Sequence, residues 1–125
     1  MNMGILLLKE ESKTMGTHIF SCSNFWKDAI NKAQTILRLA NITEIGILKV
    51  EPLARLPKSG FSIHENSYEF GYVLEGNVII GNGIEEKEIK EGEIFYNDPC
   101  TPHYTSNNTI KPSKVLWFLI PPLNN

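Results

Sequence analysis

Short runs of β-forming residues, separated by turn signals about every ten residues, occupy the chain after Asn41 and restrict it to an all-β fold. The runs that we expect to form or begin strands lie at residues 45–50, 61–64, 69–74, 78–80, 85–90, 94–96 and 114–120. Glycine and asparagine mark several of the turns between them, as in Gly81-Asn82-Gly83, because both residue types tolerate positive φ angles. The pattern predicts a sandwich or barrel of short strands.

Residues 23–40 carry a different pattern. Ser23 can accept backbone hydrogen bonds at a helix N-terminus, and apolar residues then recur at three- and four-residue spacing from Phe25 to Ala33. We therefore expect one short helix at about residues 24–32. The helical period could continue to Ala40, but residues 35–39 also alternate as a strand does, so both structures stay open there.

The chain has 125 residues, which fits one domain of ordinary size. Its hydrophobic content of 42% is normal for a globular protein and too high for a disordered one. We interpret residues 17–125 as a single domain. We interpret residues 1–16 as a loosely organised lead-in, in which Gly4 to Leu8 could form a strand that pairs with a neighbouring copy.

Charge and apolar patterning exclude several classes of partner. The formal net charge is −2, so there is no basic surplus to neutralise phosphates, and we expect no nucleic-acid partner. The apolar run from Gly4 to Leu8 is too short to span a bilayer or to form the core of a signal peptide. We therefore expect no membrane association and a cytoplasmic location, where Cys22 and Cys100 would be free thiols.

Three residues are candidates for metal-ion chemistry. His64 stands five residues before Glu69, just ahead of an expected strand, and His103 stands at the start of another. Imidazole and carboxylate groups are common ligands of transition metals, and two histidines with one carboxylate leave coordination positions open for a substrate. Cys100 lies three residues before His103, and we interpret it either as a turn residue or as a thiol that faces the site.

The residues around these candidates form two motifs. In the first, Gly60 precedes His64 and Glu69, and six residues then separate Glu69 from Gly76. In the second, His103 lies eleven residues after Gly92. Over residues 45–120 the chain resembles the small single-domain cupins, in which a first motif with His-x-His, a glutamate and a glycine is followed by a second with a histidine.

The resemblance implies a double-stranded β-helix, a jelly-roll-like barrel whose mouth holds a divalent transition metal such as Fe, Mn, Zn or Ni. By the same resemblance His64, Glu69 and His103 are metal ligands. Asn66 stands where the family has its second histidine, so it is either a weak fourth ligand or a group that hydrogen-bonds a ligand.

Two functions fit this site. The first is an enzyme that acts on a small molecule, as a dioxygenase, an isomerase or a lyase, with the metal polarising or activating an oxygen atom. The second is a non-catalytic cupin that binds or senses a small molecule with a weakly held metal or none. The sequence alone does not decide between them, because one fold supports many chemistries.

Aromatic residues on the expected barrel strands suggest a further contact. Phe70 and Tyr72 have the opposite parity to Glu69, so they lie outside the barrel wall if Glu69 points inward. Outward aromatic side chains and open sheet edges need cover, and we therefore expect a homodimer.

Overall fold

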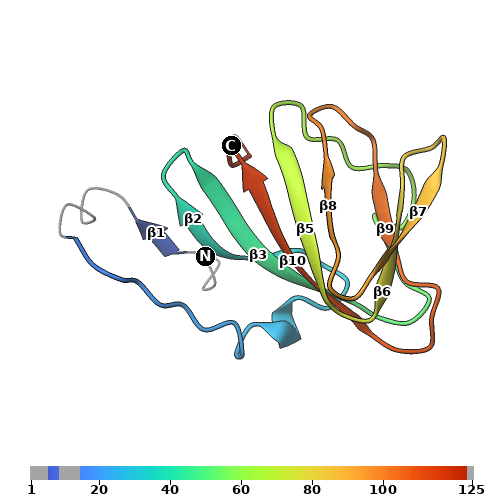
Figure 1. Ribbon diagram of the computed structural model, residues 1–125, viewed down its shortest axis with the longest axis horizontal. Helices are drawn as coiled ribbons and strands as arrows, with labels where there is room; N and C mark the ends of the chain where they lie inside the picture. Colours follow the sequence, from blue (N-terminus) through green and yellow to red (C-terminus); the bar gives the residue numbers. More distant parts are fainter. Residues whose placement is uncertain (1–5, 9–14, 124–125) are drawn as a thin grey trace.

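The computed structural model describes residues 6–8 and 15–123, and it contains two β-sheets that face each other (Figure 1). The larger sheet contains, in spatial order, β1 (Leu6–Leu8), β2 (Gln34–Leu39), β3 (Thr43–Val50), β10 (Ser113–Ile120), β5 (Tyr68–Glu75) and β8 (Ile94–Asn97). The smaller sheet contains β4 (Arg55–Leu56), β9 (Tyr104–Ser106), β6 (Asn77–Gly81) and β7 (Glu86–Lys90). Among the named strands, every pair except the parallel β1–β2 pair is antiparallel, which agrees with the expected all-β fold.

The core lies between the two sheets and follows the two-residue period of the strands. In β10 every second side chain is buried, so that Val115, Trp117 and Leu119 point inward while Leu116 and Phe118 point outward. Together with Leu48, Val50, Val73 and Val78, these inward side chains form the main hydrophobic cluster. The inner face of the larger sheet therefore supplies most of the core, and it also lines any cavity between the two sheets.

The helix expected at residues 24–32 is absent, and that prediction is wrong. A single 3₁₀ turn, η2 (Trp26–Asp28), stands in its place, and no side chain caps its N-terminus. The chain then extends along β3, because the Lys49 N–H donates to the Ala29 carbonyl at 2.8 Å and the Asn31 N–H donates to the Lys49 carbonyl at 2.7 Å. These bonds to β3 use backbone groups that a longer helix would need. The apolar side chains of this segment pack against the larger sheet and not along one face of a helix.

Other expectations near this segment have mixed outcomes. Residues 34–39 form the strand β2, which settles the alternative that the sequence left open. Residues 61–64 do not form a strand, because Ser62 alone among them forms a β-bridge, with His103. Both cysteines are free thiols, as expected.

The N-terminal segment pairs within its own chain. Leu6–Leu8 form β1, parallel to β2, at one edge of the larger sheet, while the rest of the expected Gly4 to Leu8 strand lies outside the described residues. Pairing of this strand with a neighbouring copy stays a prediction. Within residues 6–8 and 15–123, no helix is long and apolar enough to cross a bilayer.

Candidate metal centre

Three separate segments bring the candidate ligands together on the inner side of the barrel. Glu69 is the second residue of β5 and points inward, opposite to Phe70. His64 lies in the loop that leads into β5, and His103 lies directly before β9 and is buried. Ser62 and His103 exchange two backbone hydrogen bonds, which hold the His64 loop against the start of β9.

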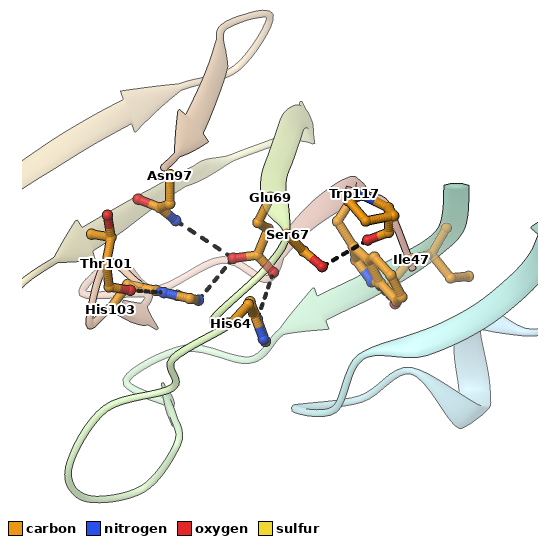
Figure 2. A network of polar contacts seen from close by, with 9 residues as sticks. Ile47, His64, Ser67, Glu69, Asn97, Thr101, His103 and Trp117 are labelled. Carbon is orange, nitrogen blue, oxygen red and sulfur yellow. Dashed lines mark hydrogen bonds and ion pairs between the residues drawn. The ribbon is translucent and has the colours of Figure 1, made fainter. Parts of the chain in front are cut away.

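The three side chains converge on one point, as Figure 2 shows. His103 Nε2 lies 2.8 Å from Glu69 Oε1, and His64 Nε2 lies 3.6 Å from Glu69 Oε2. One ligand atom from each residue lies within 4.8 Å of the other two. The carboxylate therefore stands between the two imidazole rings and offers one oxygen to each.

Neighbouring polar groups fix the orientation of two of these side chains. The Thr101 carbonyl lies 2.9 Å from His103 Nδ1 and can only accept, so Nδ1 carries the proton and Nε2 faces Glu69. Asn97 Nδ2 donates to Glu69 Oε1 at 3.5 Å. These contacts could not be predicted from the sequence, although Asn97 and Thr101 both lie within the second motif.

The donor set and its spacing fit a divalent metal ion. Two ligand atoms that each lie about 2.1 Å from one ion are about 3.0 Å apart in an octahedral site and about 3.4 Å apart in a tetrahedral one. The two carboxylate oxygens of Glu69 lie 2.8 Å and 3.6 Å from the nearer nitrogen of each histidine, close to these values, while all three ligand atoms lie within 4.8 Å of one another, so the side chains would close slightly around a bound ion. His103 also has the hydrogen bond at its second ring nitrogen that ligating histidines almost always have.

Mutual interactions shift the protonation of Glu69 and His103 in opposite directions. Burial alone would raise the pKa of Glu69, but hydrogen bonds from His103 and His64 and attraction to both rings outweigh it and lower that pKa from 4.5 to about 2. Burial alone would lower the pKa of His103, but the hydrogen bond to Glu69 and its negative charge raise that pKa above 6.5. Without metal, the site therefore favours a carboxylate paired with an imidazolium.

This pairing predicts how metal affinity depends on pH. A metal ion must displace the proton from His103, so affinity should rise as the pH passes upward through the raised pKa of His103. Titrations with Zn(II) from about pH 5 to about pH 9 should show the steepest change above 6.5, the ordinary histidine value. An affinity that does not vary over this range would show that His103 is not a ligand.

The same shifts set the stability of the metal-free protein. The lowered pKa of Glu69 contributes stability above 4.5 that is lost as the pH falls toward 2. The raised pKa of His103 contributes stability below 6.5 that is lost as the pH rises through the folded-state value. This pair should therefore raise the melting temperature of the metal-free protein most between about pH 4.5 and about pH 6.5, as thermal unfolding over a pH series would measure.

The candidate ligands line a cavity of about 340 Å³ between the sheets. Its other walls are mostly apolar and include Leu48, Leu56, Phe95, Val115, Trp117 and Leu119. A volume of this size is at the lower end of the range for small-molecule sites. A molecule bound there would contact the candidate ligands with one end and apolar side chains with its body.

The two remaining candidates lie elsewhere. Asn66 is exposed in the loop before β5 and does not line the cavity, so its role as a weak ligand stays a prediction. Cys100 is exposed in a turn with a φ of 67°, and its thiol donates to the Glu65 carbonyl at 3.3 Å. The turn interpretation of Cys100 accounts for this placement.

The sequence model of the family described as "Cupin domain" matches residues 52–119, which is more than half of the chain and includes both motifs. The chain belongs to the cupin family. A curated relative, an uncharacterized protein of Methanocaldococcus jannaschii, is 36% identical over 62 residues. That match spans 50% of this chain and 50% of the relative.

Solved structures confirm the fold. An uncharacterized Klebsiella pneumoniae protein with a double-stranded β-helix domain superposes with a TM-score of 0.72 at 16% identity, over 85% of this cupin and 91% of that protein. A predicted oxalate decarboxylase from Thermotoga maritima gives 0.57 at 22% identity, over 63% and 66% of the two chains. A cupin sugar phosphate isomerase from Silicibacter pomeroyi gives 0.57 at 20% identity, over 65% and 52%. The chain is thus a double-stranded β-helix, as the motifs implied.

Proposed function

We propose that this cupin is a metal-dependent enzyme that acts on a small molecule, as a dioxygenase, an isomerase or a lyase. The observation that carries the proposal is the convergence of His64, Glu69 and His103 at a cavity with mostly apolar walls. The metal is a divalent transition ion, Fe, Mn, Zn or Ni, because two imidazoles and one carboxylate are the donor types that these ions bind.

Each part of the site has a chemical role in this proposal. When bound, the metal supplies a Lewis acid with coordination positions that three protein ligands leave open. Glu69 contributes the negative charge, and the hydrogen bond from His103 Nδ1 to the Thr101 carbonyl orients the ring so that Nε2, once it has lost its proton, can bind at the same point. The apolar walls exclude water and hold the body of the substrate, so that a reacting oxygen atom is positioned at the metal.

Two of the structural relatives support an enzymatic function. One is described as a predicted oxalate decarboxylase and the other as a sugar phosphate isomerase, and both names denote enzymes that act on small molecules. At identities of 22% and 20% these relatives support the class of function and not a substrate.

Substitution with Co(II) tests whether coordination positions are open. The visible absorption of Co(II)-loaded protein reports coordination number, and added azide should change that spectrum because it binds at an open position. The His103→Ala variant should take up little Co(II) and show no such change. A Co(II) spectrum that azide does not alter would contradict the enzymatic proposal and favour a closed, non-catalytic site.

We also propose that residues 17–125 form a single cupin domain and that it works as a homodimer in the cytoplasm. Free thiols at both cysteines support a reducing compartment.

On the outer face of the larger sheet, Phe70 stacks on Phe118 at 5.1 Å and on Tyr96 at 5.4 Å between ring centroids. Tyr96 is 58% exposed and its neighbour Ile94 is 68% exposed. The aromatic face formed by Phe70, Tyr96 and Phe118 is therefore accessible to a second copy related by a two-fold axis.

A charge on this face should separate the copies. Sedimentation of the wild type at micromolar concentration should give a mass of about twice 14.1 kDa. Tyr96→Asp should shift the mass to that of the monomer, because two carboxylates would be buried against apolar rings. Ile84→Asp is the control, since Ile84 is 94% exposed in the turn between β6 and β7, away from this face. A monomeric wild type, or a dimeric Tyr96→Asp variant, would contradict the proposal.

A further inference from the structure

A second carboxylate faces the same cavity as the candidate metal centre. The strand register pairs Glu44 of β3 with Leu119 of β10, and Leu119 with Glu69 of β5, so the three residues form one row across the inner face. Neighbouring strands are about 4.8 Å apart, which places the Cα atoms of Glu44 and Glu69 about 10 Å from each other. Both carboxylates line the cavity, and the apolar side chain of Leu119 stands between them.

The contacts of Glu44 leave it able to bind a further donor. The hydroxyl of Thr35, a buried residue of β2, donates to Glu44 Oε2 at 2.6 Å. Arg38 lies opposite Glu44 in the strand register, yet within residues 15–123 no lysine or arginine forms an ion pair with this carboxylate. In the described part of the chain no donor is bonded to Glu44 Oε1, so this oxygen can accept a hydrogen bond from a ligand in the cavity.

The cavity thus has a polar group at each side and an apolar middle. The middle is formed by Leu48, Val115, Trp117 and Leu119, which offer no hydrogen bonds to a ligand except through the backbone. A ligand with a polar group at one end alone would displace water from Glu44 Oε1 or from the candidate metal centre without replacing the hydrogen bond that the water made, which is unfavourable.

We propose that Glu44, positioned by Thr35, is a specificity-determining residue that binds a hydroxyl or amino group of the substrate. The substrate class is a small molecule with two polar ends and a short apolar body, whose oxygen-bearing end lies at His64, Glu69 and His103. This inference deepens the proposed function and rests on it, because it states which molecules the site would admit.

Fluorescence of Trp117, which lines the cavity, gives a direct test in a Trp26→Phe background. The probes are unbranched alkanoates of four to six carbons (a length of roughly two strand spacings) and their ω-amino and ω-hydroxy derivatives. We expect at least one derivative to bind the wild type at least about tenfold more tightly than the alkanoate of equal length. Glu44→Gln should abolish this advantage, although glutamine can still accept the Thr35 hydrogen bond.

Glu51→Gln is the matched control, because Glu51 follows β3, pairs with Lys49 and does not line the cavity. It should keep the advantage of the ω-substituted probes. No advantage for either derivative at any length, no Trp117 response to any probe, or an advantage that survives in Glu44→Gln would each overturn the inference. Parallel titrations with and without Zn(II) distinguish failure of this inference from failure of the proposed function. The effect of Zn(II) on alkanoate binding tests the metal centre. The comparison of the wild type with Glu44→Gln tests the inference whether or not Zn(II) is present.

Discussion

His103→Ala is expected to lower the affinity for Zn(II) or Co(II) at least about a hundredfold. The loss of a group that only hydrogen-bonds a metal ligand costs up to about a hundredfold, so the loss of a ligand itself should cost at least as much. The variant removes one of three donors and also the hydrogen bond of 2.8 Å to Glu69. The remaining carboxylate and His64 leave the ion more exposed to water and more easily lost. Competition against a chromogenic chelator measures the affinity at a pH above the raised pKa of His103.

Asn66→Ala provides the control for this experiment. Asn66 is exposed and does not line the cavity, so its removal should reduce affinity far less than the removal of His103. Circular dichroism should confirm that both variants keep the β-sheet content of the wild type. Equal losses in the two variants would show that Asn66 is a ligand in the metal-bound protein and that the ranking of ligands is wrong.

Gly46→Ala is expected to destabilise the domain by about 3 kcal/mol, the cost of severe overpacking in a core. Gly46 lies on the inner face of β3 opposite Trp117, and a Cβ atom there would overlap the indole ring and the Gln34 carbonyl oxygen. The indole cannot move freely, because Trp117 Nε1 donates to the Ile47 carbonyl at 3.1 Å. The ring that forms a wall of the cavity therefore needs a residue without a side chain beneath it.

Thermal unfolding measures this effect. The melting temperature of Gly46→Ala should fall by about 10 °C for a domain of this size. Gly16→Ala is the matched control, since no atom lies within 4 Å of a Cβ at Gly16, and its stability should change by less than about 0.5 kcal/mol. An unchanged melting temperature in Gly46→Ala would mean that Trp117 does not lie against β3.

Much of this molecule could be predicted from the sequence where a short-range pattern determines the structure. The alternation in residues 114–120 predicted β10, and the same parity placed Phe70 opposite to Glu69 on β5. The resemblance to the two cupin motifs indicated His64, Glu69 and His103 as candidate ligands, and the structure brings these three side chains together. Each motif also has a glycine at an expected turn. Both Gly76 and Gly92 adopt the positive φ angles that these turns require.

The remaining features depend on contacts between distant parts of the chain. The spacing of residues 25–33 is that of a helix, yet backbone bonds between residues 29–31 and Lys49 of β3 decide the structure. The short strands β4 and β9 have two and three residues, too few for any period to be visible. Glu44 lines the same cavity as Glu69 because β10 lies between β3 and β5 in the larger sheet. No local pattern of residues reveals this strand order.

Elemental analysis of protein purified without chelators tests the central claim most directly. We expect about one divalent transition metal ion per chain in the wild type, because three donors of the preferred types converge on one point. His103→Ala purified in parallel should contain less than about a tenth of that amount. Wild-type protein that contains no such metal, and that takes up none when Fe(II), Mn(II), Zn(II) and Ni(II) are each added, would contradict the account.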